Sequence, residues 1–238
     1  MSTQSSGLRL FWAEFRDNKV ALFALVVVIL MIFLALFASL ISPQNPYDLA
    51  NLSLMDSRRP PGFVGSGGYT HVLGTDPQGR DLLSAIFYGL RISIQIGLAA
   101  GFVSLTIGTA LGIAAAYLGG RVEALIMRLV DLQLSFPAIL LALVIVALLG
   151  QGKVQLIGAL VAAQYAYFAR TAYGAAKAER GKDYIEAALA TPLSGRLVVW
   201  RHLLPNCAPP LIVVATVQIA NSISLEATLS FLGLGLPV

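Results

Sequence analysis

The stretch from Lys182 to Asn206 reads KDYIEAALATPLSGRLVVWRHLLPN, and it is the most polar long segment of an otherwise apolar chain. Apolar runs long enough to cross a membrane flank it on both sides. The stretch is therefore expected to form a substantial loop at a membrane face. Because a long, positively charged and structured loop is rarely kept there without a soluble partner, we expect it to contact one.

The composition excludes a soluble globular protein. Hydrophobic residues make up 57% of the 238 residues and charged residues only 12%, whereas soluble domains carry about 25% charged residues. Most of the surface must therefore face the lipid bilayer or other helices. The net charge of +4 does not indicate a nucleic-acid partner, because the basic residues are scattered through loops that flank the apolar runs.

Five apolar runs predict an all-α integral membrane protein with five membrane-spanning helices. Their ranges are 20–41, 92–118, 132–149, 154–173 and about 207–234. At about 1.5 Å per residue the first run is ~33 Å long, which is enough to cross the hydrocarbon core. It is too long for the apolar region of a signal peptide and no A-x-A cleavage site follows, so an uncleaved anchor is expected. Pro137 is expected to kink the start of the third run.

The distribution of positive charge predicts the orientation of the chain. Basic residues gather before the first run, after the second and after the fourth. They are Arg9, Arg16, Lys19, Arg121, Arg128, Arg170, Lys177, Arg180, Lys182, Arg196 and Arg201. By the positive-inside rule, residues 1–19 and the loop 174–206 are cytoplasmic, whereas residues 42–91 form an outer loop. Residues 92–238 then form the core domain.

Candidate catalytic and metal-binding residues do not gather in this sequence. Cys207 is the only cysteine, which excludes an internal disulfide and a cysteine-based metal cluster. His71 and His202 are predicted on opposite sides of the membrane, so a shared metal site is not expected. A membrane-embedded hydrolase would need a nucleophile–base pair or a metal site in a span, and both histidines are in loops. No metal, cofactor or catalytic residue is expected.

Two parts of the polar stretch carry a family resemblance. The E-A-A opening (Glu186, Ala187 and Ala188) and the R-H-L-L-P-N close (201–206) are similar, in sequence and spacing, to the cytoplasmic coupling loop of ABC-transporter permeases. The chain most resembles the dipeptide/oligopeptide/nickel permeases, whose G-T-D-x-x-G-R-D segment is matched at residues 74–81. That family continues past an SFLGLG-like segment, here residues 230–235, into a sixth span. The sixth span is therefore expected to be missing at the C-terminus of this chain.

The resemblance implies a polytopic helical-bundle permease of an ATP-driven ABC importer in the bacterial cytoplasmic (inner) membrane, moving peptides, similar small solutes or nickel. It implies three kinds of partner: a second homologous permease subunit, two ATP-binding subunits and an extracytoplasmic solute-binding protein. The chain itself is expected to be non-catalytic. Residues 74–79 have the glycine spacing of a phosphate-binding loop, but they lack the Lys and Ser/Thr that hold phosphate and Mg²⁺. The alternative is an ion-coupled secondary transporter, which would want midplane charges and an internal repeat; neither is evident.

The resemblance assigns contact with an ATPase subunit to nine residues. They are Glu186, Ala187, Ala188, Pro192, Arg201, His202, Leu204, Pro205 and Asn206. The family has glycine where Pro192 stands, but Thr191-Pro192 is a good helix start. In the family, this glycine allows a turn between two short helices. In this chain the bend is expected to be formed instead by the helix start at Thr191-Pro192. The alternative for this stretch is an amphipathic helix lying on the lipid surface.

Polar residues in the fifth run form a second candidate site. They are Gln218, Asn221, Ser222 and Glu226. Acidic residues in spans are functional candidates by default, and Glu226 lies roughly 24 Å beyond Pro210 along a helix, near the outer interface. Two readings are open: lining or gating of a translocation path, and hydrogen bonding between helices. Small residues every four positions from Gly97 to Ala116 similarly fit either a lining helix or ordinary bundle packing.

Overall fold

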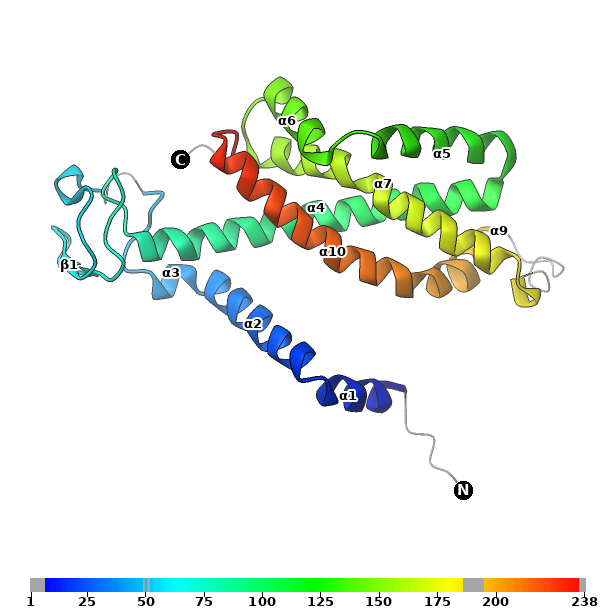
Figure 1. Cartoon of the computed structure of the whole chain (residues 1–238), viewed down its shortest axis with the longest axis horizontal. Helices are drawn as coiled ribbons and strands as arrows, with labels where there is room; N and C mark the ends of the chain where they lie inside the picture. The colour runs from blue at the N-terminus through cyan, green and yellow to red at the C-terminus, as the bar shows by residue number, and fades with distance from the viewer. Residues whose placement is uncertain (1–6, 49, 51, 186–194, 236–238) are drawn as a thin grey trace. The chain divides into compact units, whose positions relative to one another are not determined.

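Helices make up nearly all of the regular structure (Figure 1). The computed structural model describes residues 7–48, 50, 52–185 and 195–235. The chain divides into two compact units, Met1–Ile94 and Gln95–Val238, and each is described by itself. The long helix α4, Leu82–Leu118, contains the division between them.

The first unit begins with three successive helices, α1 (Gly7–Asp17), α2 (Lys19–Leu36) and α3 (Ala38–Ile41). Asn18 caps α2, because its side-chain Oδ1 accepts the backbone N–H of Ala21 at 3.1 Å. Together α2 and α3 cover the predicted first span, with a short break between them. Nearly all side chains of α2 are apolar and exposed within the unit, as expected for a helix that lipid surrounds.

Residues 42–81 form a mostly irregular segment with a polar interior. Its regular parts are η2 (Leu54–Asp56) and an antiparallel pair of short strands, β1 (Phe63–Val64) and β2 (Thr70–His71). The Nδ1 atom of buried His71 lies 3.0 Å from Oδ1 of Asp81, whose Oδ2 accepts the N–H and the hydroxyl of Ser84 at 2.7 Å. The Nε atom of Arg80 lies 2.7 Å from Oδ2 of Asp76, so an ion pair also holds this segment locally.

The second unit is a bundle organised around α7. It contains most of α4 together with α5 (Gly120–Leu134), α6 (Ala138–Leu149), α7 (Lys153–Arg180), α9 (Gly195–Val198), the π-helical turn η3 (Val199–Leu203) and α10 (Leu204–Phe231). Helix α7 packs against α5, α6 and α10. Its buried side chains are mostly small, among them Ala159, Ala163 and Ala172. The core lies along α7 because small residues let neighbouring helices approach closely.

Helices lie over all five predicted runs, but their bounds differ from the predicted ones. Helix α4 begins at Leu82 rather than at Ile92, α7 continues to Arg180, and the helical run that ends in α10 begins at Gly195. The third run, 132–149, covers α6 and only the end of α5; most of α5 occupies the expected link, and the axes of this bent pair meet at 91°. The second helix of the pair starts after Pro137, which has no N–H with which to continue α5. Among the described helices, α2, α4 and the run Val199–Phe231 are long and apolar enough to span a membrane, and the bent pair adds a fourth if it is one span. Helix α7 is long enough but more polar.

The glycines of α4 from Gly97 to Gly112 are packing positions. A Cβ atom at Gly97 would lie 2.5 Å from Cγ1 of Ile223 on α10, and one at Gly112 would lie 2.7 Å from Cβ of Ala172 on α7. Gly108 likewise leaves no room beside Phe168 of α7, where a Cβ atom would lie 2.5 Å from Cβ. The structure therefore favours bundle packing as the role of this small-residue face.

Candidate functional site

The polar stretch is described on either side of residues 186–194. Four of the nine predicted coupling residues, Glu186, Ala187, Ala188 and Pro192, lie outside the described residues. The other five, Arg201, His202, Leu204, Pro205 and Asn206, lie where η3 joins α10. Helix α9, the turn η3 and helix α10 form one continuous helical run over residues 195–231.

This helical run contains a π-helical turn next to a proline. The N–H of Leu204 donates to the carbonyl of Val199, five residues earlier, rather than four. Pro205 has no N–H and cannot make the next α-helical bond. Single π-turns inside α-helices are rare and are found frequently at functional sites. The turn thus sets the local geometry of the segment that the resemblance assigns to coupling.

The five described coupling residues differ in exposure. Arg201, Pro205 and Asn206 are exposed, whereas His202 and Leu204 are half-buried. The Nδ2 atom of Asn206 donates to the carbonyl oxygen of His202 at 2.6 Å, which fixes the side chain along the helix. The exposed members are available to a partner, and the neighbouring side chains of the helix hold it to the bundle.

The residues on the two sides of 186–194 contact each other, and those before it also contact the end of α7. The side chains of Ile185 and Val198, on either side of residues 186–194, are buried and form one cluster. The hydroxyl of Tyr184 donates to Glu179, and this bond to the carboxylate raises the pKa of Tyr184 to about 12. The Nζ atom of Lys182 donates to the other oxygen of Glu179 at 2.6 Å. The ends of the stretch are therefore held together and to the end of α7.

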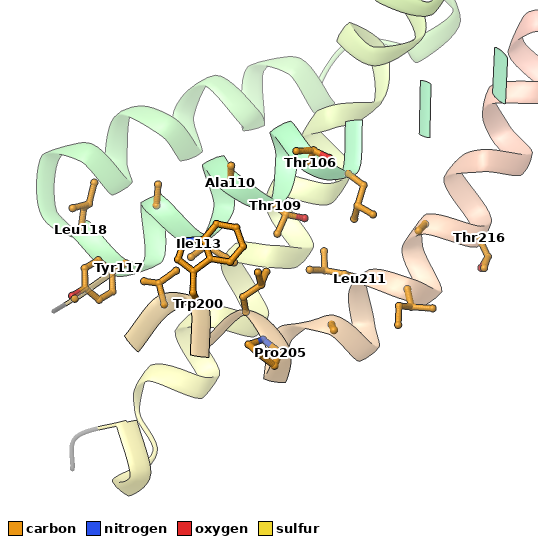
Figure 2. A pocket seen from close by; sticks show the side chains of 18 of the residues that line it. Thr106, Thr109, Ala110, Ile113, Tyr117, Leu118, Trp200, Pro205, Leu211 and Thr216 are labelled. Carbon is orange, nitrogen blue, oxygen red and sulfur yellow. The ribbon is translucent and has the colours of Figure 1, made fainter. Parts of the chain in front are cut away.

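A groove of about 1140 Å³ lies between α4 and the run of η3 and α10. Figure 2 shows Trp200, Ile113 and Leu211 among its lining side chains. None of the described residues that line it is charged, and its lining includes three threonines, Thr106, Thr109 and Thr216. The groove therefore suits an apolar occupant and has no charged group with which to hold a peptide terminus or an ion.

The structure separates the four predicted path residues into two faces of α10. Gln218, Ser222 and Glu226 are four residues apart and are only 6%, 0% and 5% exposed. The hydroxyl of Ser222 lies 2.7 Å from the side-chain amide of Gln164 on α7. Asn221 is exposed, and its Nδ2 donates to Oε1 of Gln218 at 3.3 Å. The buried members therefore fit hydrogen bonding within and between helices, and Asn221 alone lies on the open face.

A further polar cluster, which the sequence analysis did not single out, joins α5 to the end of α7. Oε1 of Glu123 accepts hydrogen bonds from the Lys177 ammonium and the Tyr173 hydroxyl. The hydrogen bonds from Lys177 and then Tyr173 hold the pKa of Glu123 below its usual value, and Glu123 in turn raises the pKa of Lys177. Tyr173 and Lys177 are four residues apart, so they share a helix face. The sequence shows that spacing, but it does not identify Glu123 on α5 as the partner of these two residues.

Arg180 makes a second junction at the same end of the bundle. Its Nη1 donates to the carbonyl oxygens of Ala116 at 2.6 Å and of Tyr117 at 2.9 Å. These carbonyls end α4 and have no partner within that helix. A cation is also favourable at a helix C-terminus, where the helix dipole is negative. Arg180 therefore caps α4 from α7.

An apolar helical bundle interrupted by one long polar stretch has the make-up of a membrane permease subunit. Residues 108–238 match the family model described as binding-protein-dependent transport system inner membrane component. Residues 6–61 match the N-terminal TM domain of oligopeptide transport permease C. The chain therefore belongs to the binding-protein-dependent transport system inner membrane component family, and the resemblance found in the sequence is confirmed.

Named relatives and a solved structure agree with this assignment. Over 230 residues the chain is 38% identical to the di/tripeptide transport system permease protein DppC of Pseudomonas aeruginosa (strain UCBPP-PA14), which covers 97% of this chain and 75% of the relative. It is also 38% identical over 228 residues to the dipeptide transport system permease protein DppC of Escherichia coli (strain K12), with 96% and 75% covered. The fold is similar to that of the inward-facing MetNI methionine ABC transporter, with a TM-score of 0.50 and 23% identity over 60% of this chain and 74% of that one.

Proposed function

We propose that this chain is a permease subunit through which an ATP-driven importer moves dipeptides or other short peptides across the cytoplasmic membrane. The observation that carries the proposal is the 38% identity to a di/tripeptide permease over 97% of the chain. The relatives named above are peptide permeases, so peptides are favoured over nickel. The family match does not favour the ion-coupled secondary transporter.

The subunit would act with a second homologous permease, two ATP-binding subunits and an extracytoplasmic solute-binding protein. Residues 1–19 and the loop 174–206 would lie in the cytoplasm, and residues 42–91 outside. The exposed side chains of Arg201, Pro205 and Asn206 support docking of an ATPase subunit at the start of α10. By the family resemblance, residues 186–188 and Pro192 would complete that contact.

The experiment that tests this function is uptake by the reconstituted transporter. Proteoliposomes that hold the permeases, the ATPases and the binding protein should accumulate a labelled dipeptide such as Ala-Ala only when ATP is hydrolysed. A protonophore should not reduce that accumulation. Accumulation driven by a proton or sodium gradient without ATP would instead support the secondary transporter.

The docking role of the coupling stretch predicts the effect of Ala187→Asp. If Ala187 packs against an ATPase subunit, the substitution buries an unpaired carboxylate there, at a cost on the order of several kcal/mol. A loss of even ~3 kcal/mol weakens docking by roughly a hundredfold. Uptake should be abolished and the ATPase should no longer co-purify, whereas the amount of permease in the membrane should stay near normal.

Ala178→Asp is the matched control for this substitution. Ala178 is exposed near the end of α7, so the same new carboxylate there stays in water and should have little effect. If Ala187→Asp transports like the parent with its ATPase still bound, the stretch is not the coupling element.

The open face of α10 is the part of this helix that would border the peptide's passage. Asn221, Ser224 and Thr228 are exposed and lie on it at spacings of three and four residues. The Ser224 and Thr228 hydroxyls each donate to a backbone carbonyl four residues earlier, at 3.1 and 2.8 Å. This local bonding satisfies a hydroxyl in a helix without a partner on another helix. The face therefore carries polar side chains that are not buried between helices.

A further inference from the structure

The turn between α4 and α5 is a sharp reversal, here called the elbow (residues 116–123). Gly119 and Gly120 both have positive φ, at 67° and 56°. Glycine adopts such angles readily, whereas other residues do so at a cost. The two glycines therefore reverse the chain within a few residues, so the start of α5 stays close to the end of α4.

The last two turns of α7 contact this elbow at three points. Tyr173 and Lys177 both donate to the carboxylate of Glu123, at the start of α5. Arg180 donates to the two carbonyls that end α4. Because α7 ends at Arg180 and the coupling stretch begins at Lys182, these contacts lie immediately before that stretch.

The segment that follows residues 186–194 contacts the elbow too. Gly195 lies against Tyr117, since a Cβ atom at Gly195 would lie 3.1 Å from Cζ of the tyrosine ring. The guanidinium carbon of Arg180 lies 5.8 Å from the centroid of the same ring. Tyr117 is thus contacted from both flanks of residues 186–194.

These contacts fix the relative positions of the helix ends more than they add to the free energy of unfolding. The side chains of Lys177 and Glu123 are 57% and 24% exposed, and exposed ion pairs contribute little to folding. Their arrangement nevertheless ties the two flanks of the coupling stretch to the end of one helix.

We infer that the elbow transmits movement of the coupling stretch to α4, with Glu123 and Tyr117 as positioning residues. Helix α4 contacts α10 at Gly97 and Gly101, so movement of α4 reaches the helix that carries the open polar face. This inference rests on the proposed function, because it takes the stretch 182–206 as the place where an ATPase subunit docks.

The test exchanges the charges of the pair in the complete reconstituted transporter. Glu123→Lys and Lys177→Glu each bring like charges together and should release the elbow from α7. Each should lower the number of dipeptides transported per ATP hydrolysed by about fivefold or more, the lower end of typical coupling between sites. The ATPase subunits should remain bound in both variants. The double variant restores an opposite-charge pair and should recover most of the ratio.

Two further variants keep the test independent of the charge exchange. Tyr117→Phe keeps the ring between Arg180 and Gly195 and should transport like the parent, whereas Tyr117→Ala removes the ring and should lower the transport-to-ATP ratio. Arg128→Glu is the matched control, since Arg128 is an exposed residue of α5 outside the cluster. It should leave the ratio unchanged.

The inference is overturned if both single charge variants and Tyr117→Ala keep the parental ratio within about twofold, or if the double variant stays as poor as the single ones. Failure of the proposed function looks different, because the parent transporter itself would then show no ATP-dependent uptake. In that case a distance between spin labels at Arg121 and Val154 still tests the elbow. A nucleotide-dependent change in the parent that Glu123→Lys abolishes supports the inference, and a change that the variant keeps overturns it.

Discussion

Arg58 is the one non-glycine residue with positive φ among those described, at 54°. Its neighbours hold it there. The N–H of Arg58 donates to the carbonyl of Asp76 at 3.0 Å, and the N–H of Arg59 donates to Oγ1 of Thr75 at 2.8 Å. The left-handed conformation costs an L-residue about 1–2 kcal/mol. The irregular segment 42–81 therefore stores strain at a residue whose side chain is exposed.

Replacing this residue by glycine should stabilise the irregular segment 42–81. Arg58→Gly removes the left-handed penalty of about 1–2 kcal/mol, while the greater freedom of the unfolded chain returns about 0.4–1 kcal/mol. A net gain of about 0.5–1 kcal/mol is expected, measured as slower hydrogen exchange of amides in residues 54–81. Arg58→Ala keeps the penalty and should show no gain. An equal gain in both variants would mean that the side chain, not the backbone, is the source of strain.

The Glu123–Lys177 pair predicts a pH dependence of the elbow. Bonding to Lys177 and Tyr173 lowers the pKa of Glu123 from 4.5. The stabilisation of the elbow by the Glu123 carboxylate is therefore complete above that value, and it is lost as pH falls through the lower pKa of the folded state. The pKa of Lys177 is raised from 10.5, so its share is lost only as pH rises beyond that value. The spin-label distance between Arg121 and Val154 should be constant between about pH 6 and 8 and should change only in acid below about pH 4.5. A change near neutral pH would contradict this.

At the scale of single helices, the buried and open faces of α10 predict different phenotypes. Ser222 is fully buried against α7, so Ser222→Leu overpacks the bundle and should cost about 1–3 kcal/mol. Asn221→Leu changes an exposed side chain, so it should alter stability by no more than about 0.5 kcal/mol but reduce peptide uptake. Thermal unfolding in detergent and uptake in vesicles measure the two effects. Normal uptake by Asn221→Leu would remove the open face from the passage.

The helices were largely predictable from the sequence because each expected span is a continuous apolar run. Helix α5 was harder, since its charged residues made residues 121–131 look like a loop. The structure accounts for them: Asp131 pairs with Arg170, and Gln133 donates to the carbonyl of Ala162 at 2.7 Å. Polar contacts to a helix distant in sequence leave no periodic apolar signal.

The path residues show the same limit of sequence reasoning. The polar stripe on the fifth run was identified, but its division into buried and open faces was not. Gln218 and Ser222 share a face because they are four residues apart, whereas Asn221 lies one position away from that face. Which face is buried depends on α7, because the Ser222 hydroxyl forms a hydrogen bond with the side chain of Gln164 on that helix. A pattern within one helix does not say where its neighbour lies.

For the whole molecule, the orientation is the prediction on which the coupling proposal depends. In a Cys207→Ala background, a cysteine at Gln78 should react with a membrane-impermeant reagent from outside, and one at Ala178 only from the cytoplasm. Both side chains are exposed in the structure, so access rather than burial decides the result. Labelling of both positions from one side would contradict the orientation.

Helix α2 has a consequence for how the protein is made. Only 6% of its spanning residues are buried within the described chain, so folding of the chain itself hides almost none of this apolar surface. Water opposes exposure of such a surface from the moment of synthesis. A ribosome that completed this chain in free solution would release an aggregating polypeptide. Delivery to the insertion machinery during translation is therefore a requirement that α2, its first membrane-spanning helix, places on the cell.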